Sequence, residues 1–490
     1  MRFEMQFCSI FLIFIFLLIT FTCGQFQIRP TYRDKHRLPK YQLTRIPLKT
    51  DSFTVSGHSS GAAAATHFYL SYYAANSDGI ALFSSIHFLC GGGSLVTLIP
   101  CLRGWGNSTD SIRLAHLFAN ANLIEPLDHM RHKRHYIFHG NADPVIHFDS
   151  GVKVFEFFDN FSDNVRFKCY NAAHSLPTKT CGISCGGIPS NPGTGCSKCD
   201  FSAIYDGLNY LYGGNLVEPT TTTCRPKYNK DGLTFADQSE FMSPLTLRTA
   251  SLLPDAVLYT PPQCRVNSSL CTLHIAFHGC RHSIQNDGMD YLKCSGYMEM
   301  ADSNNFIVLF PQVRQSPLDA ITLFHCWDLY GYTGPLYGTR LGSQNQVIAR
   351  MVGRILGIDV KNLNPNNPPS IPKIRTAFNF LFKYLKSLLR YKLEFQFLQT
   401  STPFSCTEII MGKISSITAT IRTEIDGKNK GSSPGILFPG IPGKRDPEIP
   451  GFEELCGRRE DVAVGSVGEY GRVSSSTGRQ GPWGTDATRF

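Results

Sequence analysis

The chain has 490 residues, of which 42% are hydrophobic and 17% are charged. This composition supports a large buried core and excludes a wholly disordered chain or a fibrous repeat. The formal net charge is +9, but the first 360 residues hold 29 basic and 26 acidic side chains. The sequence of this nearly neutral part shows no basic stripe for a phosphate backbone, so nucleic acid is not a predicted partner.

The first 24 residues have the pattern of a secretory signal. Arg2 precedes an apolar stretch at 7–21, and Thr22-Cys23-Gly24 has the small residues typical of a cleavage site. An uncleaved membrane anchor is the alternative, although the stretch is shorter than the ~20 residues of a spanning helix. We therefore expect an extracellular protein without stable membrane insertion after the signal is removed.

Export fits the remaining sequence features. Three glycosylation sequons begin at Asn107, Asn160 and Asn267, and 15 of the 17 cysteines follow residue 24, so disulfides are expected. The spacing of four cysteines superficially resembles a zinc site, but two local disulfides are favoured in an oxidising compartment. These four are Cys181, Cys185, Cys196 and Cys199. No metal and no organic cofactor is predicted.

Residues 25–360 are predicted to form one domain of the α/β class. Short β-type runs alternate with longer stretches compatible with helix, which favours a mainly parallel sheet with helices on both faces. Ligands and chemistry in such sheets lie at the carboxyl ends of the strands. The clearest strand candidates are 52–56, 134–139, 164–170, 273–277 and 306–310.

The composition changes after residue 360. Residues 361–430 are interpreted as a linker and a basic amphipathic segment, because apolar side chains recur at helical spacing among lysines and arginines over 374–398. That segment could lie on a membrane surface, dock on the main domain, or have no selected structure. Residues 431–490 contain 12 Gly and 6 Pro and are predicted to be a disordered tail. The sequence leaves open whether this extension is genuine or an error in the predicted gene.

A nucleophile motif lies at the end of the first strand candidate. Gly57-His58-Ser59-Ser60-Gly61 follows that strand and precedes a helix-forming stretch at 62–73, the context in which G-x-S-x-G is a nucleophile elbow. The glycines permit a tight turn that presents the Ser59 hydroxyl at the positive end of the helix. An ordinary Gly/Ser turn is the alternative.

A serine nucleophile needs a base and an acid that orients the base. Asp143 lies in the loop after strand candidate 134–139, and His174 lies in the loop after 164–170. The order Ser59, Asp143, His174 is that of α/β-hydrolase triads. Asp143 could instead cap a turn before proline. Less well placed rivals are Asp149, Asp163, His58, His135, His139 and His147.

Acyl transfer also needs donors for the oxyanion. One donor is the backbone N–H of Ser60, directly after the nucleophile. A second motif, His278-Gly279-Cys280, follows strand candidate 273–277, but in an ordinary α/β-hydrolase that strand precedes the elbow. The observed order predicts a circularly permuted α/β-hydrolase whose late strand supplies the oxyanion loop.

Five segments together resemble the circularly permuted, single-domain extracellular poly(3-hydroxybutyrate) depolymerases. They lie, in the family's order, at residues 54–61, 139–143, 173–178, 273–280 and 326–328. The resemblance implies Ser59 as nucleophile, His174 as base and Asp143 as its partner. It also implies the amides of Ser60 and Cys280 as the oxyanion hole, and Trp327 as a wall of the substrate crevice.

The resemblance further implies two disulfides, Cys181–Cys199 and Cys264–Cys271, which leaves Cys185–Cys196 as an additional bridge. The sequence departs from the family at Ala62 to Ala65, in the stretch 80–101, and at Leu329, where an aromatic residue is expected. The first two departures put the packing beside the elbow in doubt, and the third puts the affinity for polyester in doubt.

The favoured hypothesis is a secreted serine esterase that cleaves poly(3-hydroxybutyrate) or related oligomers through an acyl-enzyme. A polyester or a small ester is then its partner. Two alternatives remain: a feruloyl or acetyl esterase acting on polysaccharide, and an inactive secreted binding protein on a hydrolase scaffold.

Overall fold

The computed structural model describes residues 39–187, 195–220, 228–315 and 325–358. The predicted signal at 1–24 and the predicted segments at 361–430 and 431–490 lie outside these residues and stay predictions. In the part of the chain that is described, no helix combines the length and the apolar character that crossing a bilayer requires.

A nine-stranded sheet organises the described residues, with the strand order β1-β9-β10-β12-β11-β2-β3-β4-β5. Strand β10 is antiparallel to β9 and β12, and the other neighbours are parallel. The predicted mainly parallel sheet is therefore confirmed. The strands are β1 (Lys40–Tyr41), β2 (Phe53–His58), β3 (Ser77–Phe83), β4 (Arg134–Gly140), β5 (Val165–Tyr170), β9 (Leu233–Asp237), β10 (Asp255–Tyr259), β11 (Thr272–Phe277) and β12 (Phe306–Phe310).

The central strands read as continuous apolar runs because both of their faces are covered. In β12 every residue is buried. Ile307 and Leu309 point into one core, whereas Phe306, Val308 and Phe310 point into the other. The same alternation holds in β3, so the sheet separates two apolar cores.

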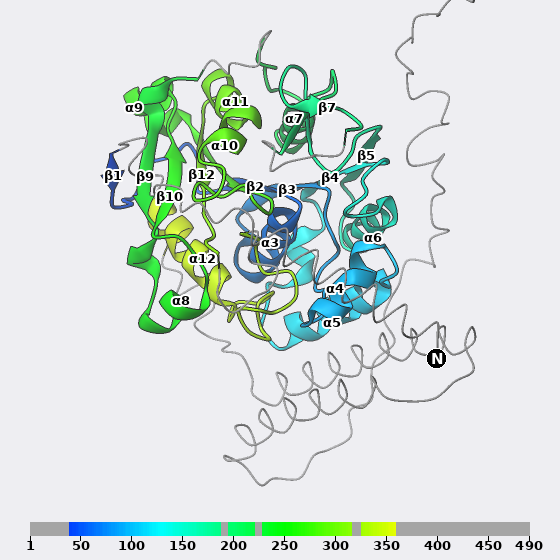
Figure 1. Cartoon of the computed structure of the whole chain (residues 1–490). Helices are drawn as coiled ribbons and strands as arrows, with labels where there is room; N and C mark the ends of the chain where they lie inside the picture. Colours follow the sequence, from blue (N-terminus) through cyan, green and yellow to red (C-terminus); the bar gives the residue numbers. More distant parts are fainter. Residues whose placement is uncertain (1–38, 188–194, 221–227, 316–324, 359–490) are drawn as a thin grey trace, which may run out of the picture. The chain divides into compact units, whose positions relative to one another are not determined.

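Helices cover the two faces of the sheet (Figure 1). Residues of α3, α5, α6 and α12 pack into one core, and residues of α7, α10 and α11 pack into the other. The helices are α3 (Ser60–Phe68), α4 (Leu95–Leu102), α5 (Ser108–Asn120), α6 (Phe148–Asp159), α7 (Ala203–Leu211), α8 (Pro244–Thr249), α9 (Pro262–Val266), α10 (Asp290–Cys294), α11 (Tyr297–Asn304) and α12 (Ser343–Leu356). A small parallel sheet of β6 (Leu176–Thr178), β8 (Cys196–Lys198) and β7 (Ile183–Ser184) follows β5.

The strand neighbours decide where the functional loops meet. Strand β2 lies between β11 and β3, and β4 and β5 follow on the same side. Because these strands are parallel, the loops that leave β2, β4, β5 and β11 lie at one edge of the sheet. All five strands predicted from the sequence are present, and β11 lies beside β2 although it comes late in the chain. The circular permutation as such stays a prediction.

Candidate active site

The turn between β2 and α3 has the strained geometry of an elbow. Ser59 has φ 56° and ψ −123°, a left-handed conformation that serine adopts only under constraint. A Cβ atom on Gly57 would lie 2.2 Å from the Gly61 carbonyl oxygen, and one on Gly61 would lie 2.3 Å from the His278 carbonyl oxygen. Both positions therefore exclude a side chain, as the tight turn predicted from the sequence requires.

The structure brings Ser59, His174 and Asp143 together. His174 Nε2 lies 2.9 Å from Ser59 Oγ, and His174 Nδ1 lies 2.7 Å from Asp143 Oδ2. When Nδ1 donates its proton to the carboxylate, Nε2 carries the lone pair that accepts the serine proton. The three residues come from the loops after β2, β5 and β4, the arrangement expected from their order in the chain.

The Asp143 carboxylate is held on its other side by the backbone. Its Oδ1 accepts hydrogen bonds of 2.9 Å from the N–H groups of Val145 and Ile146. Burial raises the pKa of this carboxyl, but the charge and hydrogen bond of His174 and the nearby donors outweigh burial and lower it to about 2. Asp143 is therefore ionised at neutral pH and orients the His174 ring.

The rival histidines have other partners. His139 Nε2 lies 2.8 Å from the carbonyl oxygen of Ile146, to which it can donate. His135 contacts the Tyr69 hydroxyl, and His147 contacts Arg103. His58 is buried behind the elbow, with its ring centroid 5.4 Å from that of His174. The histidine that is hydrogen-bonded to Ser59 Oγ is His174.

The carboxylate rivals lie elsewhere as well. Asp163 lies at the surface, where it pairs with His132 at 3.7 Å. Asp149 lies in the first turn of α6. The carboxylate that is hydrogen-bonded to His174 is that of Asp143.

The loop after β11 lies against the nucleophile. A Cβ atom on Gly279 would lie 3.3 Å from Ser59 Cβ, so glycine allows this loop to approach the elbow. Cys280, the next residue, forms a disulfide with Cys326. The side chain of Ser60 accepts a 3.4 Å hydrogen bond from the Trp327 N–H. The two residues predicted as oxyanion donors thus flank Ser59 in the structure.

Trp327 lies in the interior of the described structure. Its side chain is 0% exposed and packs on the rings of Phe277 and His278, with centroids 5.0 and 5.6 Å away. The Trp327 side chain thus has no exposed surface in this conformation, and its role as a wall of the substrate crevice stays a prediction. The side chain packs against Phe277, the last residue of β11.

The residues that depart from the family pattern pack without disruption. Ala62 to Ala65 are buried in a regular helix, and Ala63 shares a small apolar cluster with Cys90, Leu98 and Leu329. The stretch 80–101 forms most of β3, the first part of α4 and the disulfide Cys90–Cys101. Leu329 is also buried.

The disulfides differ from those expected. Cys264–Cys271 is present as predicted. The predictions Cys181–Cys199 and Cys185–Cys196 are wrong, because Cys199 pairs with Cys185 and Cys196 pairs with Cys294. Sequence spacing favoured local bridges, whereas α10 brings Cys294 against β8 from a distant part of the chain. With three of the four cysteines in disulfides, a four-thiolate zinc site does not form.

One group among the described residues has ligand atoms spaced for a metal ion. It consists of His87, Cys90 and Cys101, whose ligand atoms all lie within 4.8 Å of one another. The two sulfur atoms are joined in a disulfide, so they do not act as thiolate ligands.

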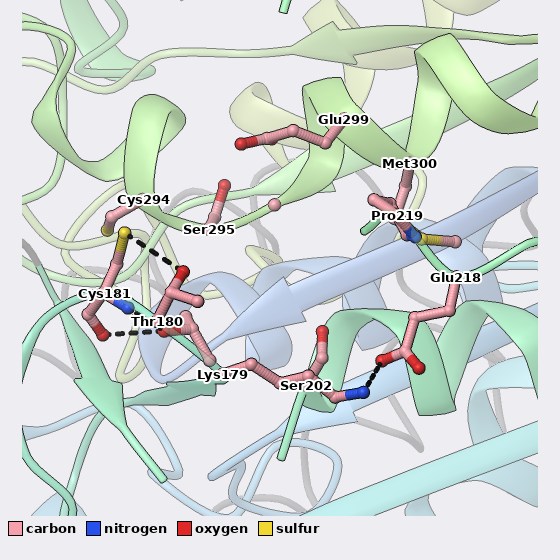
Figure 2. A pocket seen from close by; sticks show the side chains of 12 residues that line it. Lys179, Thr180, Cys181, Ser202, Glu218, Pro219, Cys294, Ser295, Glu299 and Met300 are labelled. Atoms are coloured by element: carbon pink, nitrogen blue, oxygen red, sulfur yellow. Dashed lines mark hydrogen bonds and ion pairs between the residues drawn. The ribbon is translucent and has the colours of Figure 1, made fainter. Parts of the chain in front are cut away.

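A cavity of about 60 Å³ lies away from the triad, between β6, the start of α7 and the start of α11. Figure 2 shows its lining, with Lys179 paired to Glu218 at 2.6 Å. Burial raises the pKa of the Glu299 carboxyl to about 7, although a hydrogen bond from the backbone of Glu299 itself acts in the opposite direction. No residue of the candidate triad lines this cavity.

Sequence reasoning missed a group of rings behind the triad. The rings of His58, His282 and Tyr291 lie 5.1 to 6.4 Å apart in near-parallel pairs. His282 Nδ1 also lies 3.0 Å from Asp287 Oδ2. Burial, reinforced by the two neighbouring histidines, holds the pKa of His58 well below its ordinary value. A neutral His58 adds no positive charge beside His174.

Comparison with known proteins agrees with the sequence motifs. The chain is 27% identical over 339 residues to "Poly(3-hydroxybutyrate) depolymerase" of Delftia acidovorans, covering 67% of this chain and 64% of that protein. It is 24% identical over 329 residues to "Polyhydroxybutyrate depolymerase" of Talaromyces funiculosus, covering 64% and 92%. The chain thus spans slightly less than two thirds of the Delftia protein. No family model matches the chain.

Solved structures share the fold. A PHB depolymerase complexed with an R3HB trimer superposes with a TM-score of 0.57 at 23% identity, covering 65% of this chain and 100% of that one. PHB depolymerase from Penicillium funiculosum gives a TM-score of 0.56 at the same identity and coverage. The α/β-hydrolase type of fold expected from the sequence is therefore confirmed, and the chain is related in sequence to depolymerases of this kind.

Proposed function

We propose that the protein is a serine esterase that hydrolyses poly(3-hydroxybutyrate) or its oligomers outside the cell. The observation that carries the proposal is the hydrogen-bonded series Asp143, His174, Ser59, with distances of 2.7 and 2.9 Å at a strained elbow. The substrate class rests on the polyester-degrading relatives and on the R3HB trimer bound by a protein of the same fold.

In the proposed reaction His174 Nε2 takes the hydroxyl proton as Ser59 Oγ attacks the ester carbonyl carbon. The carbonyl oxygen becomes an oxyanion that accepts hydrogen bonds from the amides of Ser60 and Cys280. His174 then gives its proton to the leaving alkoxide as the C–O bond breaks. Water repeats the sequence on the acyl-enzyme, which releases the acid and restores the serine.

The surface near the site suits a water-insoluble substrate. Val96 and Ile99 on α4, with Trp105 and Val145, are each at least 48% exposed. The chain around Trp105 runs beside the loop that carries Asp143, because the His147 N–H donates to the Leu102 carbonyl oxygen. Exposed apolar side chains are typical of a surface that binds an apolar partner where they form a contiguous patch.

The test compares three substrates with one purified protein: p-nitrophenyl butyrate, a poly(3-hydroxybutyrate) film and feruloylated xylan. We expect hydrolysis of the first two and none of the third. Ser59→Ala should abolish it, and Ser52→Ala, at the other end of β2, should retain it. Release of ferulate without film hydrolysis would identify a polysaccharide esterase instead. Absence of activity on all three would favour a binding protein, and undiminished activity in Ser59→Ala would remove the nucleophile assignment.

A further inference from the structure

The two proposed oxyanion donors come from different parts of the chain. Ser60 begins α3, and Cys280 lies in the loop after β11. An oxyanion hole works only when both amides point at the same developing charge from about 2.7 to 3.1 Å. Some feature of the structure must therefore fix the position of one amide relative to the other.

The segment His325-Cys326-Trp327 contacts both of these parts. On the side of β11, Cys326 is bonded covalently to Cys280, and His325 Nδ1 lies 3.0 Å from Ser283 Oγ. On the side of α3, the Trp327 N–H donates to Ser60 Oγ at 3.4 Å. All three members of this segment are buried. One short stretch of backbone is thus joined to both proposed donors.

The segment is itself anchored by Asp328. Its Oδ1 accepts from the N–H groups of Tyr330, Gly331 and Tyr332, and its Oδ2 accepts from the N–H and the hydroxyl of Thr333. The Asp328 N–H donates to Gln344 on α12 at 3.1 Å. A buried carboxylate that accepts five hydrogen bonds holds this turn in one conformation. The stretch can therefore act as a fixed reference for the loop and the helix.

We propose that the Cys280–Cys326 disulfide and the Ser60–Trp327 hydrogen bond set the spacing of the two oxyanion donors, so that the segment 325–328 is a positioning element for the transition state. The proposal rests on the proposed function, because it assumes that these amides stabilise an oxyanion. It assigns to Cys326 and Trp327 a role in kcat through the position of the two amides.

The chain offers a matched control. Strand β11 has a disulfide at each end: Cys271, bonded to Cys264, directly precedes it, and Cys280 lies in the loop that follows it. Cys264, Cys271 and Cys326 are buried, and Cys280 is half-buried. The double variant Cys280→Ser/Cys326→Ser removes the bridge at the proposed oxyanion loop and keeps its backbone amides. The variant Cys264→Ser/Cys271→Ser removes the bridge at the opposite end of the same strand.

The experiment measures kcat and KM for p-nitrophenyl butyrate, the rate of phosphonylation by a p-nitrophenyl alkylphosphonate, and the thermal midpoint. We expect Cys280→Ser/Cys326→Ser to lose at least about tenfold in kcat, approaching the roughly 10²-fold effect of losing one donor, with KM changed less than about threefold. Phosphonylation should slow by a similar factor, because its tetrahedral adduct needs the same donors. The control variant Cys264→Ser/Cys271→Ser should keep kcat within about twofold of the wild-type value. This should hold even if its thermal midpoint falls as far as that of Cys280→Ser/Cys326→Ser.

Ser60→Ala is a milder variant that removes only the hydroxyl facing Trp327. It should lower kcat in the wild-type background and have less effect when the bridge is already absent, since coupled contacts are not additive. If Cys280→Ser/Cys326→Ser does not fold, the kcat of Ser60→Ala tests the positioning proposal. An unchanged kcat in both, or equal losses in the two disulfide variants, would overturn the proposal.

Labelling by the phosphonate also distinguishes a failure of the proposed function from a failure of the positioning proposal. If the wild-type protein is not labelled at Ser59, the proposed function fails. If it is labelled and Cys280→Ser/Cys326→Ser is labelled equally fast, only the positioning proposal fails.

Discussion

Replacing Asp143 by Asn tests the triad most sharply, because the change preserves shape and removes charge. Asn Oδ1 can still accept from the N–H groups of Val145 and Ile146. Its Nδ2 would then face His174 Nδ1, which lies 2.7 Å from the carboxylate in the structure. Two donors cannot share one hydrogen bond, so His174 would place its proton on Nε2. In that tautomer it cannot accept the Ser59 proton.

The size of the effect follows from two contributions. The pKa of Asp143 is lowered from 3.8 to about 2. At ~1.4 kcal/mol for each pH unit, the folded site favours the carboxylate by about 2 to 3 kcal/mol. An equal loss of free energy from the transition state would lower kcat by about 30- to 150-fold. The wrong tautomer should bring the total to about 10³- to 10⁴-fold.

The assay is kcat for p-nitrophenyl butyrate, with thermal unfolding as the measure of folding. Asp163→Asn is the control, because that carboxylate is exposed and pairs with His132 at the surface. We expect the control to match the wild-type protein. A folded Asp143→Asn protein with kcat within about tenfold of wild type would show that His174 does not depend on this carboxylate.

Three further outcomes are expected. Trp327→Phe should lower the free energy of unfolding by about 1 to 3 kcal/mol and leave KM within about twofold, since the indole is buried. A large rise in KM at unchanged stability would instead support the crevice role. The Glu299→Gln variant should become more stable relative to wild type as the pH rises from about 4.5 to about 7, by less than about 3 kcal/mol, because Glu299 ionises at lower pH in the unfolded chain than in the folded one. Denaturant unfolding of both proteins at the two pH values measures this change. A difference in free energy of unfolding that is the same at both pH values would contradict the prediction. Replacing Trp105 and Ile99 by Ser should slow hydrolysis of a polymer film and leave p-nitrophenyl butyrate unaffected; equal losses on both substrates would exclude a surface role.

The sequence predicted the part of the fold that positions the triad. The five strand candidates had strong local signals, and three of them end at loops that carry Ser59, Asp143 and His174. Parallel strands place such loops at one edge, so the order of elements was enough to expect proximity. The observed contacts of 2.7 and 2.9 Å agree with that expectation.

The sequence could not predict contacts that depend on how distant elements pack. Cys196 has several cysteines nearby in the chain, yet it pairs with Cys294 because α10 lies against β8. Strand β3 was missed because Ser77, Asp78 and Gly79 interrupt its apolar pattern. The antiparallel β10 gave no signal of its direction, since orientation depends on the neighbouring strands.

The segment Cys326-Trp327-Asp328 shows why a motif does not by itself define a role. Its aromatic residue suggested substrate contact, but each side chain turns toward the protein: the cysteine to Cys280, the indole to Phe277 and His278, and the carboxylate to its own loop. A residue that sets the distance between two backbone amides tolerates substitution as poorly as one that touches the substrate, because oxyanion stabilisation depends steeply on geometry. The two roles differ in kinetics, since a positioning residue changes kcat and a contact residue changes KM.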